Sequence, residues 1–185
     1  MSILLPDGVV LNDGTIGTTE IDMAFATTKG IFAVECKHRH SFIRGSLAAD
    51  EWQDDRSIMK SPIKQNANHI RILRENMMDD EKMRPYADIP IYNVFVSNVP
   101  IILNVMGKEK TIDMIYHHND IALFVLNYGG KLKRSWFMSY VDTLDDALSK
   151  ESAEQINEYL FSHRGDKRAL EAHINYVKST HPEDL

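Results

Sequence analysis

The stretch TEIDMAFATTKGIFAVECKHR, residues 19–39, decides the fold that the sequence predicts. β-branched and aromatic residues flank a turn signal at Thr28-Lys29-Gly30, a pattern typical of two paired strands. Hydrophobic side chains alternate along both strands with charged or small ones, so each strand has one hydrophobic face and one face that carries charge. The charged and small set is Asp22, Ala24 and Ala26 on the first strand, with Ala33, Glu35 and Lys37 on the second.

The loop between the strands decides whether Asp22 lies on the same face as Glu35 and Lys37. A two-residue loop at Lys29-Gly30 places Asp22 opposite Lys37, and a four-residue loop over residues 27–30 places it opposite Glu35. Either even loop gathers the three charges on one face, with paired Cβ atoms about 4.5–5.5 Å apart. An odd loop without a bulge would turn Asp22 to the other face. We expect an even loop.

Two carboxylates and an amine beside several alanines form an unusual sheet surface. Buried charges are costly unless they are paired or bound to a metal, and we expect the alanines to leave a hollow above the sheet. Carboxylates at this separation suit Mg²⁺ or Mn²⁺, and Lys37 beside such an ion could orient or deprotonate an attacking water. The alternative is a surface Asp–Lys–Glu ion pair, because structural ion pairs are common. Cys36 falls on the hydrophobic side, where we expect a small buried residue.

A helix is expected to begin at Ser61-Pro62, with Ser61 as its N-cap and Pro62 in its first turn. Gln65 lies near this helix start, where the positive end of the helix dipole favours an anion. The apolar period predicts one buried helix face, made of Ile63, Ala67, Ile70 and Met77. Residues 89–97 then read as a central strand, and the order strand–helix–strand predicts a right-handed crossover that returns to the sheet.

Two more helices are expected near the C-terminus, over residues 152–161 and 168–177, with Asp142 capping a helix entry before them. These helices are expected to pack on the sheet or to form a homodimer contact. We expect one domain over residues 1–185, with a core over about 17–128 and C-terminal helices over about 142–179. The fold class is therefore α/β (α+β), a mixed central sheet flanked by helices.

Composition restricts the function classes further. The 185 residues are 43% hydrophobic and 26% charged, which is ordinary for a globular domain. Apolar runs are too short to span a bilayer, no signal-peptide layout is seen, and a single Cys permits no internal disulfide, so we expect a cytoplasmic protein without a membrane partner. The net charge of −6 argues against strong non-specific DNA binding but allows a local basic groove. Arg39, Lys60 and Lys64 are the candidates for contacts with nucleic-acid phosphates.

Three pieces of the sequence resemble, in order, the nuclease-related domain (NERD) family, a branch of the restriction-endonuclease-like PD-(D/E)xK superfamily. They are Glu20-Ile21-Asp22, residues 30–37 (GIFAVECK) and residues 62–66 (PIKQN). They match an acidic strand, a Gly-Ile-Phe-x-x-Glu-x-Lys strand and a Pro-x-x-Gln-Asn helix start, and the similarity covers about residues 17–99. The family usually begins with a helix that carries Gly-x-x-Gly-Glu. The residues before Ile21 read as strand and loop, so the resemblance supplies no counterpart of that glutamate.

The resemblance implies a restriction-endonuclease-like core and a role for each matched residue. Asp22 and Glu35 would bind Mg²⁺ or Mn²⁺, with the backbone carbonyl of Cys36 as a further ligand. Lys37 would position the attacking water or the scissile phosphate, and Gln65 would orient that lysine or contact the nucleic-acid backbone. The similar RecB-like nucleases have a tyrosine four residues after the glutamine, whereas this chain has His69 there.

Two function classes follow from these observations. The first is a Mg²⁺-dependent nuclease that acts on DNA, and the sequence does not separate DNA from RNA as the substrate. The second is a catalytically inactive nuclease-fold module that binds nucleic acid or a partner protein. The acidic charge balance and the unmatched first-helix glutamate favour this second class.

Overall fold

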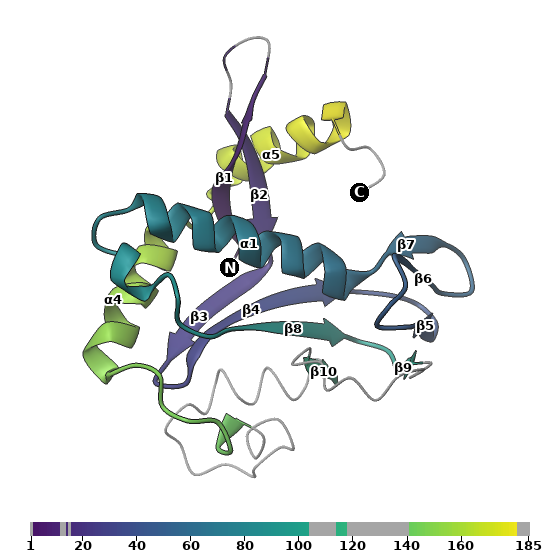
Figure 1. Cartoon of the computed structure of the whole chain (residues 1–185). Helices are drawn as coiled ribbons and strands as arrows, with labels where there is room; N and C mark the ends of the chain where they lie inside the picture. Colours follow the sequence, from purple (N-terminus) through teal and green to yellow (C-terminus); the bar gives the residue numbers. More distant parts are fainter. Residues whose placement is uncertain (1, 12–13, 15, 104–113, 118–140, 181–185) are drawn as a thin grey trace.

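The computed structural model describes residues 2–11, 14, 16–103, 114–117 and 141–180 (Figure 1). Its helices and mixed sheets confirm the expected mixed α/β class. The elements, in chain order, are β1 (Ile3–Val10), β2 (Ile16–Ile21), β3 (Met23–Thr27), β4 (Gly30–Lys37), β5 (Ile43–Gly45), β6 (Glu51–Gln53), β7 (Ile58–Lys60), α1 (Pro62–Asp79), the 3₁₀ helix η1 (Arg84–Tyr86), β8 (Ile91–Ser97), β9 (Ile101–Leu103), β10 (Met114–His117), α4 (Lys150–Ser162) and α5 (Lys167–Thr180). Residues 104–113 and 118–128 of the expected core lie outside the described part of the chain.

The central sheet has the strand order β10–β8–β4–β3. Its β3–β4 hairpin pairs Ala24 with Ala33 and Thr27 with Gly30, so the expected even loop is confirmed. The ladder ends at Met23 paired with Val34, and one more pair in the same register sets Asp22 opposite Glu35, as the four-residue loop required. Gly30 adopts a φ of +133°, and a Cβ atom added there would lie 2.5 Å from the carbonyl oxygen of Pro90. Close packing against the start of β8 therefore fixes the glycine and, with it, the register.

A strand–helix–strand crossover is present as predicted, because β4 and β8 pair in parallel and α1 lies between them in the chain, across one face of the sheet. Its right-handedness stays a prediction. Ser61 caps α1 through its hydroxyl, which accepts a hydrogen bond from the Lys64 amide, and Pro62 occupies the first turn. On the opposite face of the sheet, Phe32, Val34 and Val94 form a second hydrophobic cluster. Burial on both faces explains why β4 and β8 are nearly continuous hydrophobic runs.

The predicted inner face of α1 was only partly right. Ile63 and Met77 are buried as expected, but Ala67 is exposed, and Asn66 and His69 point inward instead. A pattern based on apolar residues missed these two positions because their polar groups have partners in the interior. The Asn66 side-chain amide donates to the carbonyl oxygen of Ala33 at 2.9 Å and to the side-chain oxygen of Asn93 at 2.8 Å.

The alanines of the hairpin do not leave the expected hollow. Ala26 and Ala33 belong to the main hydrophobic core, where Leu73 and Met77 of α1 and Ile156 of α4 cover them. Their small side chains allow the helices to pack closely on the sheet. The hollow lies further along the hairpin, at the carboxylates of Asp22 and Glu35.

The N-terminal segment forms an antiparallel ribbon, β1–β2, that projects from the sheet (Figure 1). Residues 163–165 run along the start of β1, where the amide of Leu4 donates to the carbonyl oxygen of His163 at 2.9 Å. Both predicted C-terminal helices are present: α4 packs against β3, and α5 packs against β2. The expected helix entry at Asp142 was wrong, because α4 begins at Lys150 and Ser149 is its N-cap.

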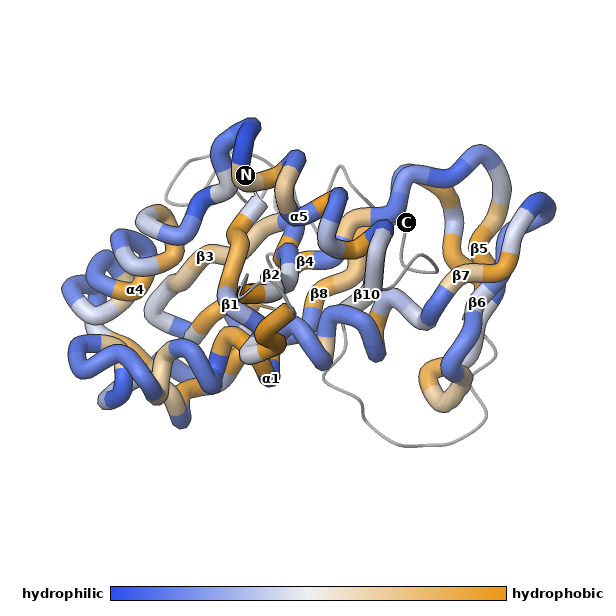
Figure 2. The backbone as a smooth tube through the Cα atoms, turned by 90° about the horizontal axis from the view of Figure 1, so that it is seen from above, coloured by the Kyte–Doolittle hydropathy of each residue, from blue (hydrophilic) through white to orange (hydrophobic). Residues whose placement is uncertain are grey.

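A second, smaller sheet has the order β7–β6–β5–β9, and Trp52 anchors it against Phe95 of β8. Seen from above, β1 and β8 are strongly hydrophobic, whereas much of α4 is hydrophilic (Figure 2). No helix in the described part of the chain is long and apolar enough to cross a membrane.

Candidate active site

Asp22 lies at the bend between β2 and β3, where the chain leaves the ribbon and enters the central sheet. One of its oxygens, Oδ2, accepts a 2.6 Å hydrogen bond from the backbone amide of Cys36. This bond directs the carboxylate toward the end of β4, beside Glu35 and Lys37. The prediction that Asp22 shares a face with these two residues is therefore confirmed.

Glu35 is a buried carboxylate, with 2% of the residue exposed. Lys37 Nζ lies 2.6 Å from its Oε1, and His69 Nδ1 lies 3.7 Å from its Oε2. An ion pair is thus present, as the alternative interpretation of the sequence required, but Glu35 is in the interior rather than on the surface. A buried carboxylate held by a lysine has much stronger electrostatic interactions than a solvated pair.

The two carboxylates have perturbed acidities. Burial raises the pKa of Glu35 to about 7, the charge of Asp22 adds to this effect, and Lys37 opposes it. Burial also raises the pKa of Asp22, and the hydrogen bond from Cys36 opposes that shift. Ionisation of both carboxylates at once is therefore unfavourable. A proton or a cation between them would remove this repulsion.

These residues lie in a cleft of about 710 Å³ that is built by several elements. Its floor includes Asp22, Glu35 and Lys37, at the junction of β2 with β4. One wall is the N-terminal half of α1 with β7 (the α1 wall), and the other is α5 with the β1–β2 ribbon (the α5 wall). Figure 1 shows α1 crossing the base of the ribbon and α5 lying beside the ribbon.

Three of the predicted substrate-binding residues lie in the α1 wall: Lys60, Lys64 and Gln65. Gln65 is half-buried in the first turn of α1 and lines the same cleft as the carboxylates. Lys64 Nζ donates to Asp50 Oδ1 at 2.5 Å and to the carbonyl oxygen of Ala48 at 2.9 Å. Asp50 is highly exposed, so this ion pair lies in high dielectric, where an ion pair is weak. The contact of Lys64 with a nucleic-acid phosphate stays a prediction.

Arg39 is not brought into the cleft. Its backbone pairs with the Asn98 side chain, and its guanidinium lies 3.4 Å from the sulfur of Met59 and 3.8 Å from Asp54. Arg39 therefore links the end of β4 to the small sheet through these contacts. Its predicted contact with nucleic acid stays a prediction.

Cys36 is exposed, so the expectation that it is a buried hydrophobic residue was wrong. The alternation of side chains places it on the expected face, but it stands next to the end of β4, beyond the buried cluster around Val34. Only its backbone was implied as a metal ligand, and exposure of the side chain does not affect that prediction.

Several residues of the cleft were not found from the sequence. His69 was noted only as a departure from a motif, and it lies beside Glu35. In the α5 wall, His173 Nδ1 lies 2.9 Å from Thr18 Oγ1, and the Tyr176 hydroxyl donates to Asp7 at 2.8 Å. These partners are separated by 155 and 169 residues, so no local pattern could reveal them.

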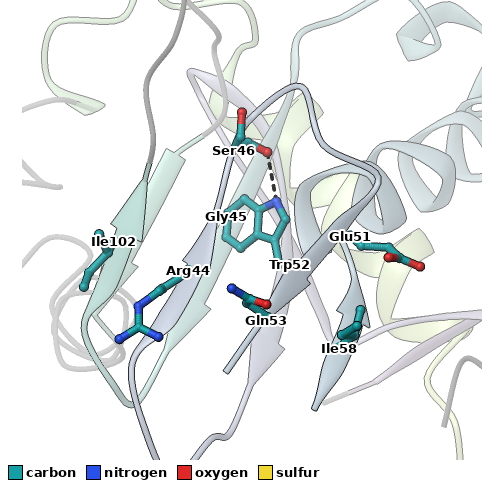
Figure 3. Close-up of a pocket in the computed structure, with 8 residues that line it drawn as sticks. All are labelled: Arg44, Gly45, Ser46, Glu51, Trp52, Gln53, Ile58 and Ile102. Carbon is teal, nitrogen blue, oxygen red and sulfur yellow. Dashed lines mark hydrogen bonds between the residues drawn. The ribbon is translucent and has the colours of Figure 1, made fainter. Parts of the chain in front are cut away.

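A second hollow, of about 600 Å³, lies on the small sheet (Figure 3). Trp52 forms its base, held by a 3.0 Å hydrogen bond from its indole nitrogen to the carbonyl oxygen of Ser46. Neither Asp22 nor Glu35 lines it, and its charged residues, Arg44 and Glu51, are exposed. The first cleft is therefore the candidate active site.

Comparison with protein families gives one result that bears on this site. The model of the nuclease-related domain matches residues 3–98, just over half of the chain, which includes both carboxylates and all of α1. Comparisons with curated proteins and with solved structures each found no match. The matched segment contains the ribbon, the β3–β4 hairpin, α1 and β8, so the chain belongs to the nuclease-related domain family.

Proposed function

We propose that this protein is a Mg²⁺- or Mn²⁺-dependent nuclease that hydrolyses phosphodiester bonds in DNA. The observation that carries the proposal is the buried Glu35 beside Asp22 and Lys37, at the floor of a cleft whose wall presents Gln65 and two lysines. Membership of a nuclease-related family supports the same reaction class.

The donor groups fit a hard divalent cation. One oxygen of Asp22 is held by the Cys36 amide and one oxygen of Glu35 by Lys37, which leaves one oxygen of each carboxylate to ligate. Among the described residues no group of three or more His, Cys, Asp and Glu side chains is arranged to hold a metal. The ligands would thus be two carboxylates, the carbonyl oxygen of Cys36 and several waters, a set that suits Mg²⁺.

When bound, the ion would stabilise charge on the scissile phosphate and lower the pKa of an attacking water. The protein's own groups have defined tasks around that position. Lys37, whose ammonium is held by Glu35, donates to the water or to a phosphate oxygen and offsets the negative charge that develops there. Gln65 donates from the first turn of α1 and fixes the orientation of the neighbouring phosphate.

Cleavage of supercoiled plasmid in Mg²⁺ tests the proposal. Asp22→Asn, Glu35→Gln and Lys37→Ala are each expected to lower the nicking rate by at least about 100-fold, the loss typical of a removed catalytic group. Asp88→Asn, Glu158→Gln and Lys82→Ala make the same chemical changes at exposed positions outside the cleft and should cut like the wild type. Equal nicking by both sets of variants would refute the assignment.

A second function is a nuclease-fold module that binds nucleic acid or a partner protein without cleavage. The observation that favours it is the 2.6 Å ion pair between Lys37 and Glu35, which balances the buried charge without a metal. Calorimetric titration with Mn²⁺ separates the two functions. The nuclease binds Mn²⁺ and loses that heat on Glu35→Gln, whereas the binding module shows no heat in either protein.

A further inference from the structure

The two walls of the cleft differ in their chemistry. The α1 wall contributes Lys60 and Lys64 together with the side-chain amides of Gln65 and Asn68. The exposed carboxylates of Asp50 and Glu51 also line the cleft on this side, beside the two lysines. The part of the α5 wall that the structure describes contributes no lysine or arginine to the lining. It presents Ile174, which is 40% exposed, and the half-buried Val177. An exposed isoleucine inside a charged cleft is a position where a ligand would remove apolar surface from water.

The charges on the α5 wall are negative and locally held. Asp7 accepts hydrogen bonds from the Tyr176 hydroxyl at 2.8 Å and from the Val9 amide at 2.9 Å. Glu20 lies 3.8 Å from His173 Nε2. These contacts keep two carboxylates on this side of the cleft, where they repel phosphate groups. The lysines of the described lining are Lys37 on the floor and Lys60 and Lys64 on the α1 wall. A phosphodiester backbone in the cleft would therefore lie on that side, with the groups attached to it facing α5.

We infer that the cleft binds a single strand of nucleic acid, with its phosphates along Lys60 and Lys64 and an unpaired base against Ile174 and Val177. This inference rests on the proposed function and names its substrate class. A base in a duplex has both faces covered by its stacked neighbours, whereas an unpaired base has apolar faces that side chains can cover. The cleft volume, about 710 Å³, is in the range of sites for small ligands, which suits a short run of one strand.

Fluorescence anisotropy with labelled oligonucleotides tests this inference. The protein carries Asp22→Asn, to suppress cleavage, and Mg²⁺ is present. The probes are one DNA sequence as a single strand, the same sequence as a duplex, and the corresponding single-stranded RNA. We expect the Kd of at least one single strand to be about tenfold or more below that of the duplex, because stacking contributes roughly 1–3 kcal/mol per base. Equal affinity for the single strands and the duplex, or no binding to any probe, overturns the inference.

Variants locate the strand on the two walls. Ile174→Ser/Val177→Ser should weaken single-strand binding about fivefold or more and leave duplex binding unchanged. Ile58→Ser/Val10→Ser removes the same side-chain types from exposed positions outside the cleft and should change neither affinity. Lys60→Gln/Lys64→Gln should reduce the slope of log K against log salt by about 1.4, since each phosphate contact on a single strand contributes about 0.7. Equal effects of the two apolar pairs would overturn the placement of the base.

The outcome is distinguishable from that of the proposed function. Plasmid nicking that depends on Asp22 and Glu35, together with equal affinity for duplex and single strand, would leave the nuclease proposal standing and end this inference. Preferential single-strand binding by a protein that cleaves neither the plasmid nor the single-stranded probes in Mg²⁺ would do the reverse.

Discussion

The two oxygens of Glu35 face different neighbours, Lys37 on one side and His69 on the other. The carboxylate is nevertheless surrounded by protein, and burial raises its pKa to about 7 from an ordinary value of 4.5. In the folded protein this group holds its proton over a pH range where the unfolded chain has lost it. The protonation of this residue therefore makes the folding stability depend on pH.

Glu35→Gln is expected to alter the pH dependence of unfolding in metal-free buffer. Because the folded pKa is the higher one, the wild type is most stable below pH 4.5 with respect to this group, and it loses stability as pH rises toward 7. Between pH 5 and 8 the wild type should lose about 2–3 kcal/mol more unfolding free energy than Glu35→Gln. Urea denaturation at the two pH values measures the difference.

Glu158→Gln is the control, because Glu158 is exposed on α4 and the same substitution there should leave the wild-type pH dependence intact. A gap between wild type and Glu35→Gln that is the same at pH 5 and pH 8 would contradict the buried titration. It would mean that the amide changes packing alone.

At the scale of elements, the start of α1 is held to the sheet by a polar contact rather than by an apolar one. Asn66 donates to Ala33 of β4 and to Asn93 of β8, and Asn93 in turn donates to the carbonyl oxygen of Ile63. This small network joins the helix to the two parallel strands of the crossover. It also fixes the position of Gln65, the neighbouring residue that faces the cleft.

Asn66→Ala should lower the free energy of unfolding by about 2–3 kcal/mol, because the buried side-chain oxygen of Asn93 and the carbonyl oxygen of Ala33 each lose the hydrogen bond that Asn66 donates. Asn68→Ala removes the same side-chain amide from an exposed position two residues further along α1. It should change stability by less than about 0.5 kcal/mol. Urea denaturation of both variants makes the comparison. Similar values for the two would show that the network adds nothing to the attachment of α1.

How much of this arrangement the sequence predicts depends on how local its cause is. The alternation of side chains predicted that Asp22, Glu35 and Lys37 share a face, and the Ser61-Pro62 pair predicted the start of α1. The exact register could not be chosen, because both even loops keep the alternation. What decides it is the close approach of Pro90 to Gly30, a contact across 60 residues. The burial of Asn66 was missed for the same reason, since its partners lie on other strands.

At the scale of the whole molecule, the C-terminal helices α4 and α5 cover the edge of the sheet and form one wall of the cleft, both of which are otherwise built by the family segment, residues 3–98. α4 is fixed to the free edge of β3 by Asn157, whose side chain accepts from the Ala26 amide at 2.7 Å and donates to its carbonyl oxygen at 2.9 Å. α5 closes the cleft through Tyr176 and His173. Neither helix lies within the matched residues 3–98, so the likeness to the family could not predict this wall.

Asn157→Ala is expected to cost about 1–3 kcal/mol of unfolding free energy, because the Ala26 amide and carbonyl both lose their partner at a largely buried strand position. Asn175→Ala, at an exposed position on α5, is the matched control and should be nearly neutral. Chemical denaturation followed by far-UV circular dichroism gives both values. A neutral Asn157→Ala would mean that hydrophobic contacts alone, such as those of Ile156, attach α4 to the sheet.

The hydrogen bond between Tyr176 and Asp7 joins two residues that are 169 positions apart in the sequence. During synthesis the acidic pair and α1 emerge well before α5. At a typical elongation rate of about 5–20 residues per second, the chain needs roughly 4–16 s to extend from residue 98 to residue 176. On the ribosome the carboxylates therefore spend seconds in a cleft that has only one wall, before α5 is available to form the second.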